Sequence, residues 1–472
     1  TLEFKLREAE LRAALASLTG ASYPSEELTE CYKKFLLNQF HDILPGSHIH
    51  PVYEDAMNDY RNVSERLDAM LASTAGNEYF NSLNFTRSAI TFIEDENGNV
   101  TRHGVKGFWS IPALAGLSTG KVTVLPSKEG WLNTTVCDKC DCLVVETPYY
   151  RAKLSNDGSF VSLYDKELDR EWVKEGCGFN KLHLYADNPG VYDAWDILPN
   201  YKDVQVALNV DKPLALISSD GSSAEFAVTF TTEKSTWKMI LRFFADSHAI
   251  EVENVVDWDE KHKLVKVNFG PDVLTRELVC DTSAGFVKRD LTKNTSWQQA
   301  RFEVCHHKWC DMSESGSGIA IINEGKYGVG LEKDEISLSL LRATIRPDIT
   351  SDIGHHDFCY TILPHSGDAV EAQVNKTAME YNVPLCKSNV TVPAALRDTL
   401  NNCGLYLQAM KRSEDGQYLI LRLSEQDGRR GKIAFPFEVQ TMNLIEDIEG
   451  STKVISYHPF ELITVAVKPE DL

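Results

Sequence analysis

The first 76 residues place apolar side chains at helical spacing. The pattern predicts a helix that ends at Gly20, a second that begins near Pro24 and a third that follows Pro51. Three helices of this length most simply form a bundle. In the second helix an apolar stripe is expected to face a core, and it consists of Leu28, Cys31, Tyr32, Phe35, Leu36 and Phe40.

From about residue 78 the pattern changes from helical spacing to short alternating runs. These runs are rich in Val, Ile, Tyr, Phe and Thr and are separated by turn sequences such as "EDENGN", "SNDG" and "SEDG". Strands do not alternate with helices, which argues against a Rossmann or TIM arrangement within this chain. The predicted fold class is therefore mainly β, with an N-terminal helical bundle followed by antiparallel β-sandwiches.

The predicted domain boundaries follow these changes of pattern, with further breaks near Cys137 and within "YNVPLCKSNVTVPA". A helical bundle is expected at residues 1–76 and a small β segment at 77–136. A large antiparallel β-sandwich is expected at 137–385 and a C-terminal β-sandwich at 386–472.

Charge and composition narrow the class of partner. The 472 residues carry a net charge of −21, which argues against binding to nucleic acid or to an anionic membrane surface. No stretch approaches the roughly 18 uninterrupted apolar residues of a membrane span. Eleven cysteines, an odd number spread along the chain, favour a reducing, cytoplasmic location. The chain opens at Thr1 inside a helical pattern, so we expect a fragment, a processed subunit or a trimmed product.

The sequence "NQFHDILPGS" crowds polar residues at the end of the second helix. If that helix continued, Asp42, seven residues after Phe35, would point to the buried side. The C-terminal end of a helix is electronegative and therefore disfavours a carboxylate without a cation. One interpretation is a hydrogen-bonded histidine at a helix end. The other is part of a divalent-cation site made by His41 and Asp42, whose remaining ligands come from far away or from another chain.

Two further sequences carry candidate binding chemistry. "DAWD" joins Asp193 and Asp196 to Trp195, and carboxylates beside an aromatic ring commonly hold a sugar. A solvated loop with a half-buried tryptophan explains it equally well. "GHHDF" carries His356 and Asp357 to one end of a predicted strand, and by itself it reads as a polar loop that leads into a strand.

Two cysteine-containing sequences have simpler explanations. "CDKCDC" places Cys137, Cys140 and Cys142 at a spacing that can bind zinc or an iron–sulfur centre, but no close fourth ligand follows. An exposed cluster with no ligand is the simpler interpretation. "CHHKWC", at residues 305–310, lies in a β-rich stretch, so a structural role is expected.

Taken together and in order, "LLNQFHDILPGSHIHPVYEDA", "LYADNPGVYDAWD" and "LSLLRATIRPDITSDIGHHDFCYTILPH" resemble glycoside hydrolase family 38, the class II α-mannosidases. The bacterial and cytosolic branch is the one resembled, and the similarity continues to the C-terminus. It implies a zinc-dependent retaining enzyme that hydrolyses terminal α-D-mannosyl residues of glycans or oligosaccharides. Family members combine an N-terminal α/β catalytic domain, a helical bundle and β-sandwich domains.

The resemblance also implies roles for individual residues. His41 matches the zinc ligand that the bundle contributes, and Asp42 matches the carboxylate that contacts the hydroxyls of the sugar. The segments that border the cleft supply further substrate-binding candidates, namely Asp193, Trp195, Asp196 and His356.

The nucleophile, the acid and the other zinc ligands belong to the family's N-terminal domain, which has no counterpart in this sequence. No catalytic residue is therefore expected in this chain. That domain is the expected partner, in cis or as a separate subunit, and the chain alone is expected to be inactive. The alternative is a non-catalytic carbohydrate-binding or scaffold protein derived from such an enzyme.

Overall fold

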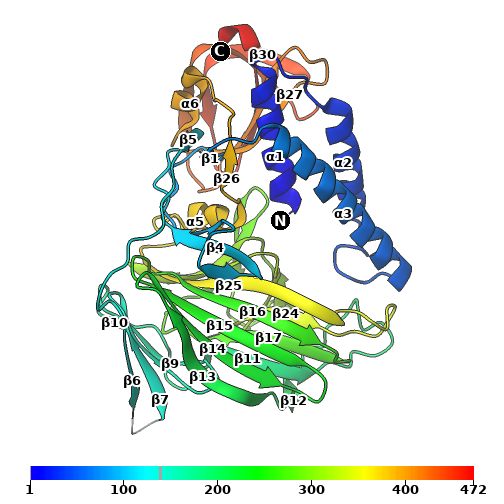
Figure 1. The fold of residues 1–472 in the computed structure, drawn as a ribbon. Coiled ribbons are helices and arrows are strands. Elements are labelled where there is room, and N and C mark those ends of the chain that lie inside the picture. Colours follow the sequence, from blue (N-terminus) through cyan, green and yellow to red (C-terminus); the bar gives the residue numbers. More distant parts are fainter. Residues whose placement is uncertain (1, 138–140) are drawn as a thin grey trace.

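The computed structural model describes residues 2–137 and 141–472 (Figure 1). These residues form mostly antiparallel sheets with helices at the N-terminal end, which confirms the predicted fold class. Cys140 of the "CDKCDC" sequence lies outside the described residues, as does Thr1. No helix in the described ranges is both long enough and apolar enough to span a membrane.

The three predicted N-terminal helices are present as α1 (Leu2–Ser17), α2 (Ser25–Leu37) and α3 (His50–Ser73). All three contact one another, but α1 also packs against the C-terminal strand β27 (Tyr406–Arg412). Leu11, Ala14 and Leu15 of α1 belong to the same buried cluster as the inner residues of the C-terminal sheet. The first helix is therefore shared between the helical bundle and the C-terminal sandwich (Figure 1).

The predicted apolar stripe of α2 is buried only in its first half. Leu28 and Cys31 are buried, whereas Leu36 is 60% exposed and Phe40 is 52% exposed. The expectation that the whole stripe faces a core is wrong at these two positions. The reason is local, because the helix ends at Leu37 and the described residues leave this end uncovered.

The large β region packs a nine-stranded sheet against a six-stranded sheet. In spatial order, the nine-stranded sheet consists of β13 (Asn209–Ser219), β14 (Ser223–Thr231), β15 (Thr236–Phe244), β16 (Ile250–Trp258), β25 (Gly354–Ser366), β22 (Ser317–Asn323), β21 (Trp309–Glu314), β18 (Glu277–Thr282) and β19 (Gly285–Asp290). The six-stranded sheet consists of β12 (Gln205–Val206), β11 (Phe179–Ala186), β17 (Lys263–Phe269), β24 (Ile336–Arg342), β23 (Gly328–Leu331) and β20 (Glu303–Cys305). Alternating side chains from both sheets, such as Phe179 and Tyr360, form one buried core.

A five-stranded sheet flanks this sandwich, and two three-stranded sheets connect it to the helices. The five-stranded sheet is made of β10 (Arg170–Glu171), β9 (Phe160–Asp165), β8 (Tyr150–Leu154), β7 (Cys142–Glu146) and β6 (Asn133–Cys137). One small sheet is β2 (Thr91–Glu94), β4 (Val105–Ser110) and β3 (Val100–Arg102). The other is β26 (Cys386–Ser388), β1 (Glu78–Asn81) and β5 (Ser118–Gly120).

The C-terminal sandwich lies at the opposite end of the molecule from the large sandwich (Figure 1). Its sheet has the order β27, β28 (Leu419–Ser424), β31 (Leu462–Val467), β29 (Gly431–Met442) and β30 (Ile448–Tyr457). Three short helices occur among the strands, and they are α4 (Ser296–Ala300), α5 (Val374–Asn382) and α6 (Ala394–Leu400).

The "CHHKWC" sequence crosses from the six-stranded sheet to the nine-stranded sheet. His306 is buried between them, and its Nε2 lies 2.8 Å from the side-chain amide of Asn323. Burial lowers the pKa of His306 to about 3, so the ring stays neutral inside the fold. Cys310 lies buried opposite Cys280 on β18. These contacts are those of a structural segment.

Candidate functional site

Three segments that are distant in the sequence meet at one end of the large sandwich. They are the loop after α2, the loop at residues 187–200 and the loop at residues 343–353. The indole Nε1–H of Trp195 donates to Asp42 Oδ1 at 3.1 Å. At the start of α3, His50 Nδ1 lies 3.0 Å from Asp348 Oδ2. The fold thus joins the sequences "NQFHD", "DAWD" and "RPDITSD".

Asp42 is a surface carboxylate, not a buried one. Helix α2 ends at Leu37 and residues 38–46 form turns, so the side chain is 37% exposed and does not point inward as a continued helix would require. Ser47 Oγ donates to Asp42 Oδ1 at 2.9 Å. The hydrogen bonds from Ser47 and Trp195 lower the pKa of Asp42, because both stabilise the charged form. The carboxylate is therefore ionised and held in one orientation.

His41 lies beside this carboxylate with its ring open to solvent. Its side chain is 77% exposed, and Nε2 is 3.5 Å from Asp42 Oδ2. The ring also packs on Phe40, with centroids 4.1 Å apart. In the described part of the chain, His41 belongs to no group of three or more metal-ligating side chains whose ligand atoms lie within 4.8 Å of one another. A metal at His41 would therefore need ligands from beyond these residues.

Trp195 offers an aromatic surface next to the Asp42 carboxylate. The residue is 51% exposed although its N–H is occupied by Asp42. The ring of Tyr192, which is 68% exposed, packs edge-on against it at 5.9 Å and 83°. Tyr192 was not among the sequence-predicted residues, and its place three residues before the tryptophan was the only signal for it. An exposed indole beside an oriented carboxylate can stack on a pyranose while its hydroxyls are hydrogen-bonded.

Asp193 is fully buried and joins two of the loops. Its carboxylate accepts hydrogen bonds from the backbone N–H groups of Ile345 at 2.7 Å and Arg346 at 3.0 Å. His262 Nδ1 lies 3.7 Å from the same carboxylate. The structure therefore places Asp193 under the loops that carry Trp195 and Asp348, where it positions them from beneath.

Asp196 is exposed, and its backbone carbonyl accepts a hydrogen bond from Arg342. The Arg342 guanidinium also binds Asp187, with Nε 2.6 Å from Oδ2. The Asp196 carboxylate stays at the surface of the loop that carries Trp195. It is available to a ligand, and its main chain is fixed by Arg342.

His356 is half-buried on β25, where its Nε2 lies 2.7 Å from the carbonyl of Asp352. Its neighbour His355 is flanked by Asp257 at 2.7 Å and Asp357 at 3.1 Å. The two carboxylates raise the pKa of His355. Within the described residues, no hydrogen bond or ion pair links His356 directly to Asp42 or Trp195.

Exposed apolar side chains flank the His41–Asp42 pair along the chain. They follow the end of α2, the connecting loop and the first turns of α3, and they are Leu36, Leu37, Phe40, Leu44, Ile49, Tyr53 and Met57. We call this the α2–α3 face. Its members are between 41% and 64% exposed, which is unusual for so many large apolar side chains in one short segment. An apolar surface of this kind indicates an interaction site.

Three family models match consecutive parts of the chain. The alpha mannosidase middle domain matches residues 1–77. The glycosyl hydrolases family 38 C-terminal domain matches residues 145–350, and the family 38 C-terminal beta sandwich domain matches residues 404–465. Two of the models describe domains of glycosyl hydrolases family 38, and the third describes a domain of alpha mannosidases. The chain belongs to glycoside hydrolase family 38.

Individual relatives agree with this assignment. Human alpha-mannosidase 2C1 is 28% identical over 447 residues, which cover 90% of this chain and 42% of that protein. An alpha-mannosidase of Saccharomyces cerevisiae is 30% identical over 404 residues, covering 80% of this chain and 35% of the relative. The chain thus spans less than half the length of these relatives.

The fold is also similar to that of a solved structure. The crystal structure of an alpha-mannosidase from Enterococcus faecalis V583 superposes with a TM-score of 0.74 at 13% identity. The match covers 99% of this chain and 66% of that one. It therefore extends over the helices and both sandwiches.

Proposed function

We propose that this chain forms the middle and C-terminal part of a zinc-dependent retaining α-mannosidase that hydrolyses terminal α-D-mannosyl residues of glycans or oligosaccharides. The observation that carries the proposal is the hydrogen bond between Trp195 and Asp42. It places an ionised carboxylate and an exposed indole side by side, next to a free imidazole. Family membership supplies the reaction class.

In this site Asp42 accepts hydrogen bonds from sugar hydroxyls mainly through Oδ2, because its lowered pKa keeps the carboxylate ionised while Oδ1 already accepts from Ser47 and Trp195. Trp195 supplies an apolar surface for the pyranose ring. Asp196 and His356 border the cleft, and Asp193 holds the loops that form it. The carboxylate nucleophile and the acid of a retaining mechanism come from the family's N-terminal domain, in cis or as a separate subunit.

His41 is the ligand that this chain would contribute to zinc. Its exposed imidazole and the adjacent Asp42 fit part of a zinc site, since zinc takes four ligands and favours histidine nitrogen and carboxylate oxygen. When bound, the metal supplies positive charge to the hydroxyls of the mannose. His41 and Asp42 alone supply fewer ligands than the four that zinc takes. The isolated chain is therefore expected to be inactive.

The α2–α3 face is the surface on which the N-terminal domain would dock. Seven exposed apolar residues flank His41 along the chain, and docking there would bury them and bring the remaining ligands to the imidazole. We also propose a cytoplasmic location, which the odd number of cysteines supports.

The proposal is tested with p-nitrophenyl α-D-mannoside. The isolated chain should show no turnover above a zinc-chelated control, whereas the same chain joined to a family N-terminal domain should be active. In that active protein, His41→Ala should lower kcat/KM by more than about 100-fold, because loss even of outer-shell partners costs about 10–100-fold. His458→Ala serves as the control, since this exposed histidine lies in the C-terminal sandwich and pairs with Glu461.

Turnover by the isolated chain would overturn the assignment of the catalytic groups to another domain. Tight mannoside binding by the isolated chain, with no gain of activity when the N-terminal domain is added, would favour the non-catalytic carbohydrate-binding protein instead.

A further inference from the structure

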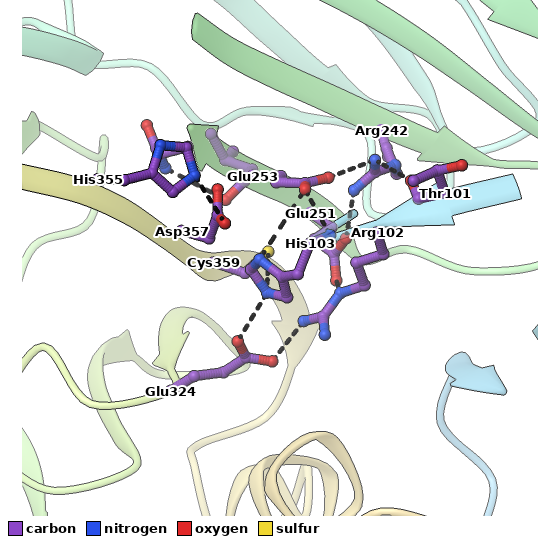
Figure 2. A network of polar contacts seen from close by, with 12 residues as sticks. Thr101, Arg102, His103, Arg242, Glu251, Glu253, Glu324, His355, Asp357 and Cys359 are labelled. Carbon is purple, nitrogen blue, oxygen red and sulfur yellow. Dashed lines mark hydrogen bonds and ion pairs between the residues drawn. The ribbon is translucent and has the colours of Figure 1, made fainter. Parts of the chain in front are cut away.

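A second cluster of ligating side chains lies outside the site described above, where the β3–β4 hairpin meets the nine-stranded sheet (Figure 2). The turn of this hairpin contains His103 and Gly104, with φ of 50° and 71°. Hairpin turns with positive φ at both central residues prefer Asn, Asp or Gly. A histidine here is unusual, and the turn places its ring between β25 and the turn that follows β22.

The ring nitrogen of His103 faces one thiol and one carboxylate. Its Nε2 lies 3.4 Å from Cys359 Sγ and 3.3 Å from Glu324 Oε2. All three ligand atoms are within 4.8 Å of one another. Tetrahedral zinc, with bonds of about 2.0 Å to nitrogen and oxygen and about 2.3 Å to sulfur, separates N from S by about 3.5 Å and N from O by about 3.3 Å. The observed separations match these two edges of a zinc tetrahedron.

The other ring nitrogen of His103 faces a carboxylate that lies beyond hydrogen-bond distance. His103 Nδ1 is buried and has no hydrogen-bond partner among the described residues. It lies 3.9 Å from Glu253 Oε1, which accepts the backbone N–H of His103 at 2.7 Å. Metal-bound histidines usually direct their second N–H toward a carboxylate of this kind, which fixes the orientation of the ring.

The surrounding ion pairs leave an excess of negative charge. Arg242 pairs with Glu251 at 2.8 Å and with Glu225 at 2.7 Å, and also contacts Glu253. Arg102 pairs with Glu251 at 3.0 Å and with Glu324. Four carboxylates therefore share two guanidinium groups. With His103 neutral, as a metal ligand must be, two negative charges stay uncompensated in this largely buried network, and Zn²⁺ bound with a Cys359 thiolate would reduce this excess to one.

We propose that His103 Nε2, Cys359 Sγ and Glu324 Oε2 bind a zinc ion that fastens the β3–β4 hairpin to the nine-stranded sheet. A thiolate, an imidazole and a carboxylate are the donors that zinc prefers. Cys359 is 1% exposed, whereas the side chains of His103 and Glu324 are 24% and 18% exposed, so water can reach the fourth position. Binding converts the Cys359 thiol into a zinc thiolate and releases its proton to solvent.

This site is independent of the His41 pair and of the proposed mannosidase activity. Its ligands come from segments other than the loop that carries His41, and one of them is the sulfur of Cys359. The isolated chain is therefore the right material for the test, because His41 has too few ligands there to retain zinc.

The test measures zinc and cobalt binding by the chain after removal of metal with a chelator. Dialysis against micromolar Zn²⁺ should leave about one equivalent bound, since the site has three protein ligands and a water. Co²⁺ in place of zinc should give the near-ultraviolet absorption of a thiolate-to-cobalt bond. Cys359→Ser and His103→Gln should each abolish this absorption and lower zinc retention by more than about tenfold. Cys305→Ser, at an exposed cysteine, and His41→Ala should behave like the parent chain.

Failure of the parent chain to retain zinc would overturn the proposal, as would an unchanged cobalt absorption in Cys359→Ser. If Cys359→Ser does not fold, the decision rests on His103→Gln, because that residue lies at a partly exposed turn. Retention of both metals by a folded His103→Gln chain would exclude the site.

Discussion

The indole N–H of Trp195 donates a hydrogen bond to the carboxylate of Asp42, although 153 positions separate the two residues in the sequence. This contact joins the loop after α2 to a loop of the large sandwich, within the sugar site that we propose. It also helps to keep the pKa of Asp42 below its usual range. The orientation of the carboxylate therefore depends on a residue from another part of the fold.

Trp195→Phe tests this dependence, because it keeps an aromatic ring but removes the N–H donor together with the five-membered ring that carries it. In the catalytically active protein, kcat/KM for an α-mannoside should fall by about tenfold, which corresponds to loss of a hydrogen bond to a charged group worth about 1.5 kcal/mol. Trp297→Phe is the matched control, since this tryptophan is 77% exposed and lies on a different element, α4. An equal loss of activity in both variants would show that the Trp195–Asp42 bond has no specific role.

Asp193→Asn tests whether the buried carboxylate positions the cleft loops. The amide is similar in size but loses two charge-assisted bonds from backbone N–H groups, so the chain should be destabilised by about 2 kcal/mol. Asp196→Asn, at an exposed position in the same loop, should change stability by less than about 0.5 kcal/mol. Chemical denaturation of both variants measures the difference. Equal stability of the two would contradict the positioning role.

Local patterns in the sequence were sufficient to predict the helices and the change to antiparallel sheets, whereas the roles of His41 and Asp42 stay predictions. These patterns were not sufficient to place Asp193, because its burial depends on backbone groups some 150 positions away. The prediction that the whole apolar stripe of α2 faces a core was wrong for a related reason. Periodicity identifies an apolar side of a helix, but it does not show whether that side meets this chain or another surface.

The proposed zinc site at the β3–β4 hairpin could not be predicted from the spacing of residues in the sequence either. His103, Glu324 and Cys359 come from three segments, and none of them lies in a short motif. The "CDKCDC" and "CHHKWC" sequences drew attention because their cysteines are close in sequence. Metal sites assembled across sheets depend on strand order, and only the folded arrangement reveals it.

The α2–α3 face should make the isolated chain self-associate. Seven exposed apolar side chains on one surface favour burial against any available apolar partner. Leu37→Glu should therefore shift the chain toward monomer in sedimentation experiments, because it replaces the most exposed apolar side chain of the face, at 64%, with a charge. Leu274→Glu is the control, since this residue is 90% exposed outside the face.

If the face is also the docking surface for the N-terminal domain, Leu37→Glu should weaken that association and reduce the activity of the reconstituted protein. Self-association that is identical in the parent chain, Leu37→Glu and Leu274→Glu would assign the contact to another surface.

The buried His306 should make the stability of the chain fall in mild acid. Its pKa is about 3 in the folded protein, against 6.5 for an ordinary histidine, because burial disfavours the charged ring. Below pH 6.5 the unfolded chain therefore binds a proton that the folded chain does not. The stabilising contribution is complete above 6.5 and is lost progressively as the pH falls toward 3.

Between pH 7 and pH 5 this linkage should remove about 2 kcal/mol from the free energy of unfolding. His306→Asn cannot titrate in this range, so its stability should fall by correspondingly less over the same interval, whatever its absolute value. His458→Asn, at an exposed histidine, should keep the pH dependence of the parent chain. Urea unfolding at the two pH values measures all three slopes, and parallel slopes for the parent and His306→Asn would show that His306 is not the titrating group.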